Sequence, residues 1–166
     1  MGTCLFASDL HGSLPRYRRL FERLVAEAPA GVFLGGDLLP PAFSAAAGRG
    51  GTQAGFVEEV LLPGFAAVRA ALGERTPRVF LILGNDDCRA EEEAIVAAGR
   101  DGLWEYAHAR RTDFGRHRVY GYACVPPTPW QLKDWERYDV SRFVDPGCVS
   151  PEEGVRSVAA PEGEAR

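Results

Sequence analysis

Residues that could bind metal ions are concentrated in three short acidic stretches of this 166-residue chain. The stretches are Asp9-Leu10-His11-Gly12, Gly35-Gly36-Asp37 and Gly84-Asn85-Asp86-Asp87. Carboxylate and amide oxygens and an imidazole nitrogen are ligands that suit divalent cations. A pair of such cations can generate a hydroxide from water at neutral pH and hold a phosphoryl group for in-line attack. The residue types therefore predict a site for divalent cations that could support metal-assisted hydrolysis.

Each acidic stretch follows an apolar run that is typical of a buried strand, at residues 4–8, 31–34 and 79–83. In an open parallel sheet, ligands bind at the carboxyl ends of the strands. Asp9 and His11, two residues apart at one strand end, can point to one ion, and Asp37 suits a bridging position. Asn85 can supply a neutral carbonyl oxygen to a second ion.

Helical patterns separate these strands and predict an α/β fold built from right-handed β-α-β units. Ser13 can cap a first helix that carries Pro15 in its first turn. A second pattern runs from 56 to 72, where Pro63-Gly64 predicts a kink or two shorter helices and Gly73 a C-cap. A short helix is expected over residues 90–98.

The remaining stretches are less regular. Residues 38–55, rich in Gly, Ala and Pro, are predicted to form a loop beside the site. Short strands are expected at 103–106 and 118–122, with a turn around Gly115 between them. Residues 125–130 read as an extended aromatic and proline loop, either structural or a wall for a substrate or partner. We predict one domain over 1–145 and an irregular tail over 146–166, laid on the surface or disordered.

The composition narrows the classes of partner and compartment. The net charge of -4 gives no overall basic footprint for nucleic acid or an anionic membrane. No apolar stretch approaches the roughly 20 residues of a membrane span, and the N-terminus lacks a leader pattern. The four cysteines form no C-x-x-C pair, and Cys4 lies in an expected buried strand, so apolar fillers or free thiols in a reducing compartment are predicted. These features predict a cytoplasmic protein.

Together, the three acidic blocks resemble the motifs of the calcineurin-like metallophosphoesterases: Asp-x-His, then Gly-Asp, then Gly-Asn-His-Asp or -Glu. The resemblance covers residues 3–90 by motif. It implies a metallophosphoesterase-like β-sandwich flanked by helices, with the metals at the carboxyl ends of the strands. It also implies hydrolysis of a phosphomonoester or phosphodiester by a metal-activated hydroxide. The metal ligands that it implies are Asp9, His11, Asp37 and Asn85.

The third block departs from that family pattern. Where the family has a histidine that protonates the leaving group or steadies the transition state, this chain has Asp86, which becomes the candidate catalytic residue. Asp87 takes the acidic position that normally orients this histidine. Arg89, just after the block, is the candidate contact for a substrate phosphate.

A second departure concerns the histidines of the family's C-terminal motifs. An isolated His and a Gly-His-x-His block complete both metal sites in the family, but this chain has only His11, His108 and His117. His108 and His117 are predicted to be surface or strand residues. We therefore expect a C-terminally truncated fold in which one ion keeps Asp9, His11 and Asp37. A second ion would have only Asp37 and Asn85.

The family binds two divalent ions, and one or none is expected here. Mn²⁺ is favoured by the oxygen and nitrogen ligands, with Fe, Ni, Zn or Mg as alternatives. The expected partner is a small phosphoester substrate, and an exposed sheet edge or face would favour a homo-oligomer. The alternative function is a catalytically incomplete family member or fragment that acts as a binding scaffold.

Overall fold

A four-stranded parallel sheet forms the centre of the computed structural model, which describes residues 2–42, 53 and 55–159. The strand order is β1-β2-β3-β4. The strands are β1 (Cys4–Ala7), β2 (Gly31–Gly35), β3 (Arg78–Ile82) and β4 (Glu105–Tyr106). All neighbouring strands run parallel, so their carboxyl ends meet at one edge of the sheet. The predicted α/β class and the four predicted strand positions in this sheet are confirmed.

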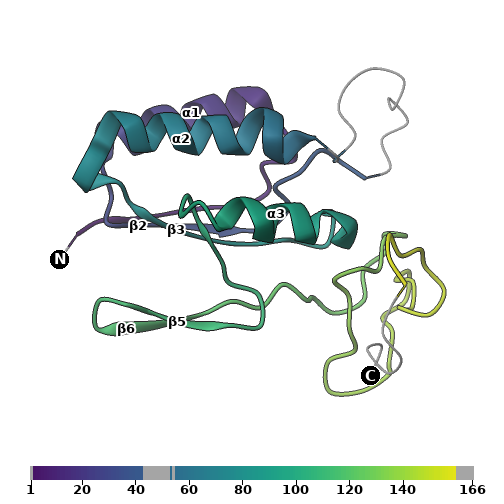
Figure 1. The fold of residues 1–166 in the computed structure, drawn as a ribbon. Helices are drawn as coiled ribbons and strands as arrows, with labels where there is room; N and C mark the ends of the chain where they lie inside the picture. The colour runs from purple at the N-terminus through teal and green to yellow at the C-terminus, as the bar shows by residue number, and fades with distance from the viewer. Residues whose placement is uncertain (1, 43–52, 54, 160–166) are drawn as a thin grey trace.

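Helices cover one face of this sheet (Figure 1). They are α1 (Leu14–Glu27), the π-helical turn η1 (Val57–Leu61), α2 (Leu62–Leu72), the 3-10 turns η2 (Gly73–Arg75) and η3 (Arg89–Glu91), and α3 (Glu92–Gly99). Pro63 lies in the first turn of α2, where its missing N–H is tolerated, and the predicted break becomes the junction of η1 and α2. Gly73 caps α2 with a φ of 57°, as predicted.

The core lies between the helices and the sheet. Its fully buried members include Leu24 of α1, Leu61 of η1, and Val32 and Leu81 of the central strands. Aromatic rings join the layers, with an edge-to-face contact of 5.6 Å between the centroids of Phe65 and Trp104. This packing fixes the sheet against the helices and so holds the loops at the strand ends in place.

A β-hairpin lies on the opposite side of the sheet (Figure 1). Its strands, β5 (Arg111–Phe114) and β6 (His117–Tyr120), pair antiparallel around the turn at Gly115. Phe114 packs edge-on against Phe33 and Phe80, with centroids 5.9 Å and 5.6 Å apart. The strand predicted over 118–122 and the turn around Gly115 are confirmed by β6 and the hairpin turn. The other strand of the hairpin, β5, was not predicted.

The expected burial of the first strand is wrong. β1 is an edge strand with β2 as its single neighbour in the sheet, and its residues alternate between exposed and half-buried. Phe6 is 70% exposed, and Cys4 is exposed instead of filling the core. All four cysteines lie within the described residues, and none of them forms a disulfide.

The C-terminal segment, residues 121–159, contains no helix or strand, and isolated bridges and side-chain contacts hold it instead. Lys133 Nζ is 2.6 Å from Glu136 Oε2, and both side chains are fully buried. Part of the predicted tail is anchored, because the Ser157 N–H donates to Asp134 Oδ1 at 2.9 Å. The Ala90 N–H donates to Ser157 Oγ at 3.0 Å, which ties this segment to η3.

The loop predicted over 38–55 lies largely outside the described residues. Among the described helices, none has both the length and the apolar character that a bilayer crossing needs.

Candidate metal site

The loops after β1 and β2 continue to pair beyond the strands. The Asp9 N–H donates to Gly36 O at 3.1 Å, and the His11 N–H donates to Asp37 O at 2.8 Å. The Gly12 N–H donates to Leu38 O at 2.9 Å. Because these bonds run from one loop to the other, the acidic stretches of the first two strands are held side by side.

The backbone of this paired region is strained. Asp9, His11 and Asp37 have φ values of 56°, 46° and 52°, in the left-handed region. That conformation costs an L-residue about 1–2 kcal/mol, although Asp and His adopt it more readily than most. Such strain is concentrated at functional sites, where surrounding structure maintains it. Three of the four predicted ligands are thus held in conformations that local preference alone would not select.

Side-chain donors from both loops converge at the strand ends. One ligand atom from each of Asp9, His11 and Asp37 can be chosen so that all lie within 4.8 Å of one another. His11 Nε2 is 3.9 Å from Asp9 Oδ1. No described residue donates a hydrogen bond to the Asp9 carboxylate, whose side chain is 65% exposed. Free carboxylate oxygens beside an imidazole are a donor set that fits a divalent cation.

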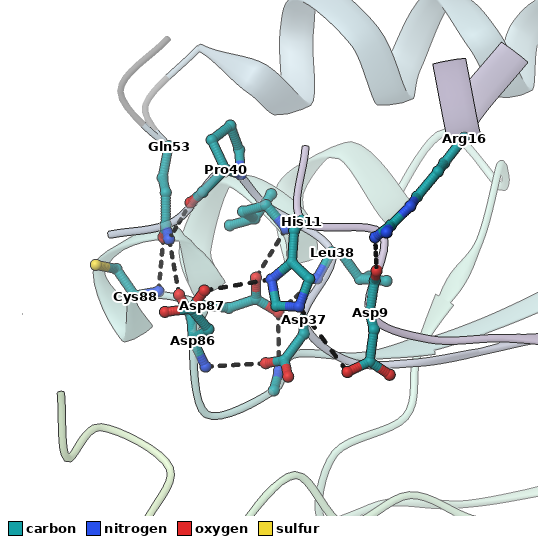
Figure 2. Close-up of polar contacts among 12 residues, drawn as sticks. Asp9, His11, Arg16, Asp37, Leu38, Pro40, Gln53, Asp86, Asp87 and Cys88 are labelled. Carbon is teal, nitrogen blue, oxygen red and sulfur yellow. Dashed lines mark hydrogen bonds and ion pairs between the residues drawn. The ribbon is translucent and has the colours of Figure 1, made fainter. Parts of the chain in front are cut away.

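The loop after β3 completes this neighbourhood (Figure 2). The Asp86 N–H donates to Asp37 Oδ1 at 2.9 Å, and Asp86 Oδ2 lies 3.2 Å from His11 Nδ1. Burial raises the pKa of Asp86, His11 opposes that shift and Asp37 adds to it. Asn85 lies half-buried in the same turn, directly after Gly84, which packs against Asp37. Its role as a ligand stays a prediction.

Asp87 points inward and braces the loops. Its buried carboxylate accepts hydrogen bonds from the backbone N–H groups of Leu38, Leu39 and Gly84 at 3.1, 2.8 and 2.8 Å. Burial raises the pKa of Asp87 to about 7, while these three hydrogen bonds act in the opposite direction. The two neighbouring aspartates of the third block therefore have different environments: Asp86 faces His11 and Asp87 faces the backbone.

Gln53 connects the loops after β2 and β3 through side-chain hydrogen bonds, and it was not predicted from the sequence. Its Nε2 donates to Pro40 O at 2.7 Å and to Asp86 O at 2.9 Å, and its Oε1 accepts from the Cys88 N–H at 2.6 Å. The side chain is buried although it follows a Gly-rich stretch. No periodic pattern or motif marks this glutamine, so only its contacts identify it.

Arg89 lies against other parts of the chain. Its guanidinium is 5.3 Å from the ring centroid of Trp135, and its Nε is 3.5 Å from Glu92 Oε2. The Arg89 N–H donates to Asp134 Oδ2 at 2.8 Å. These contacts give Arg89 a structural role. Its assignment as a substrate contact stays a prediction.

The two remaining histidines lie apart from the group of three ligands. His117 is exposed on β6, as predicted. His108 is half-buried, with its ring 5.0 Å from that of Trp135 and its Nδ1 accepting from the Ala123 N–H at 2.9 Å. Among the described residues, no further set of three His, Cys, Asp or Glu side chains has metal-binding proximity.

Comparison with known proteins gives no assignment of the chain to a family. No protein-family model matches it, and a search of curated proteins finds no match.

Proposed function

We propose that this chain is a metal-dependent phosphoesterase that hydrolyses a small phosphomonoester or phosphodiester. One observation carries the proposal: the ligand atoms of Asp9, His11 and Asp37 lie within 4.8 Å of one another at the carboxyl ends of adjacent parallel strands. The strained backbone at all three residues and the largely exposed Asp9 carboxylate support it.

We also propose the metallophosphoesterase-like sandwich for the fold. The hairpin supports it, since Phe114 packs on Phe33 and Phe80 from the side of the sheet opposite the helices. We propose in addition that the chain forms a homo-oligomer. The side chains of Phe6 and Tyr120 are 70% and 66% exposed, and exposed aromatic groups favour association.

Asp9, His11 and Asp37 would hold the cation, with Asn85 as the further proposed ligand. Mn²⁺ is the first choice for oxygen and nitrogen donors, and Fe, Ni, Zn and Mg are alternatives. When bound, the cation supplies Lewis acidity and lowers the pKa of water into the neutral range.

The protein's own groups would prepare the site for an anionic ester. Asp86 fixes one oxygen of Asp37 through its N–H. The guanidinium of Arg16 donates to Asp9 O at 2.6 Å, which places a positive charge beside Asp9. Arg16 is thus a second candidate phosphate contact, together with Arg89.

Metal content and activity test this proposal. The metal-free chain should take up Mn²⁺ and then hydrolyse a generic aryl phosphate ester, and Asp37→Ala should abolish both properties. Asp113→Ala, which removes an exposed carboxylate on β5, is the matched control and should retain both. Undiminished hydrolysis by Asp37→Ala would refute the assignment.

A binding scaffold is the alternative function. It is favoured by the described residues, in which His11 is the sole histidine of the ligand group. Stoichiometry separates the two functions: we expect one Mn²⁺ per folded chain. No uptake would support the scaffold, whereas two ions would mean that Asn85 and groups outside the described cluster complete a second site.

A further inference from the structure

Asp86 connects the two ligand-bearing loops. Its N–H donates to Asp37 Oδ1 at 2.9 Å, and its carboxylate lies 3.2 Å from the imidazole of His11. Its own carbonyl oxygen accepts from Gln53 Nε2 at 2.9 Å. A residue held from three directions in this way is well placed to set the orientation of the groups that it touches.

The two nitrogens of His11 have different surroundings. Figure 2 shows the imidazole between Asp86 on one side and Asp9 on the other. Nε2 is on the side of Asp9, 3.9 Å from its Oδ1. Nδ1 is buried and has no hydrogen-bond partner of good geometry, although Asp86 Oδ2 is 3.2 Å away. Both side chains are 35% exposed, so a small rotation can bring the two atoms into line.

The chemistry of the pair determines where the imidazole proton lies. An ionised carboxylate only accepts hydrogen bonds, so a hydrogen bond between this pair needs the proton on Nδ1. A neutral imidazole with its proton on Nδ1 has its lone pair on Nε2. Carboxylates that hold one nitrogen of a metal-binding histidine in this way fix the tautomer and the orientation of the ring.

We propose that Asp86 is a positioning residue that holds His11 in the Nδ1–H tautomer and leaves Nε2 as the nitrogen that binds the metal. This role replaces direct proton transfer to a leaving group as the function of Asp86. The assignment of the tautomer stands on the metal-free geometry, and its consequence for a metal rests on the proposed function.

The tautomer is measured on the metal-free, ¹⁵N-labelled full chain by long-range ¹H–¹⁵N correlation at about pH 8, where an ordinary imidazole is neutral. His11→Gln identifies the signals. The wild-type chain should show a protonated Nδ1 and an unprotonated Nε2. Asp86→Ala should shift the population toward Nε2–H, and Asp113→Asn, on β5, should leave it unchanged.

Manganese affinity, measured by titration calorimetry, gives the second readout. Asp86→Ala should bind Mn²⁺ about 10- to 100-fold more weakly, the usual effect of losing such a partner. Asp86→Asn removes the same charge but keeps an oxygen that can accept from Nδ1–H, so it should recover part of the affinity. Equal Mn²⁺ affinities for the Ala and Asn variants would mean that Asp86 affects binding only through its charge, which would overturn the positioning role.

The two proposals can fail separately. Absence of Mn²⁺ binding by the wild-type chain would overturn the metal function, while the tautomer spectra would still decide the role of Asp86. A wild-type His11 that carries its proton on Nε2, or a tautomer that does not respond to Asp86→Ala, would overturn the positioning role.

Discussion

Carboxylates in two regions of the molecule have opposite surroundings. At the ends of β1 and β2, the Asp9 side chain is 65% exposed and accepts no hydrogen bond from a described residue. In the third loop and the C-terminal segment, the side chains of Asp87 and Glu136 are buried and well supplied with donors. Asp87 accepts three backbone N–H bonds, and Glu136 accepts from Lys133 and from both the backbone and the hydroxyl of Thr128.

This contrast separates two uses of the same functional group. A buried carboxylate that satisfies several donors organises the chain, because removing it leaves those donors without partners. An exposed carboxylate on a strained backbone contributes little to folding and keeps its oxygens available for a cation. Mutations should therefore reduce stability at the buried carboxylates Asp87 and Glu136, and metal binding at the ends of β1 and β2.

The largest loss of stability is expected from Lys133→Ala. It leaves Glu136 buried and without its cationic partner, which costs about 3–5 kcal/mol of unfolding free energy. Chemical denaturation monitored by circular dichroism measures the loss. The double variant Lys133→Met/Glu136→Gln is the control: it removes both charges and keeps an oxygen for the Thr128 donors, so it should recover part of the stability. A loss of under about 1 kcal/mol in the single variant would show that the pair is not desolvated as described.

Asp87→Asn should have the next largest effect. The amide keeps one oxygen for the three N–H groups and places an NH₂ group against a donor, at a cost of about 1–3 kcal/mol. Urea unfolding measures this cost, with Asp113→Asn as the exposed control. Unchanged stability would mean that Asp87 does not brace the loops.

Asp37→Ala should destabilise the fold by only about 0.5–1.5 kcal/mol, since one hydrogen bond from the Asp86 N–H is lost. The same variant should lose Mn²⁺ binding, so it separates the two regions clearly. Thermal unfolding without metal and calorimetric titration with metal are the paired measurements. A stability loss as large as that of Lys133→Ala would place Asp37 among the structural acids.

The smallest effect is expected from Asp9→Gly, at about 0–1 kcal/mol of stabilisation. Glycine relieves the left-handed strain at φ 56° but gains entropy in the unfolded chain, and these terms nearly offset each other. Mn²⁺ binding should be lost. Ala28→Gly is the matched control at φ 42°, after α1, and should stabilise similarly without changing metal binding. A clearly destabilising Asp9→Gly would show that this carboxylate supports folding.

Elements with local signals could be predicted from the sequence. The strands at 31–35 and 78–82 are apolar runs, and α1 and α2 have helical periodicity. Gly73 caps α2 as predicted, whereas Ser13 takes the N-cap position of α1 without the expected side-chain hydrogen bond. The convergence of Asp9, His11 and Asp37 followed from parallel strands that end at the same edge.

Features that depend on distant contacts could not be predicted. The edge position of β1 follows from the strand order, so an apolar run alone did not reveal that Phe6 is exposed. The C-terminal segment has no periodicity because bonds such as Ser157 to Asp134 hold it in place of regular structure. Asp86 and Asp87 are identical in type, and only the fold shows which of them is buried.

The left-handed backbone at Asp9 and Asp37 has a consequence for how this chain can change over generations. A single base change converts an aspartate codon into a glycine codon, and glycine adopts that conformation without steric penalty. At these positions, the same Asp-to-Gly mutation relieves the backbone strain and removes a proposed metal ligand. A lineage selected only for persistence of the fold would therefore lose the site easily, whereas a lineage that needs the cation would have to purge such variants continually.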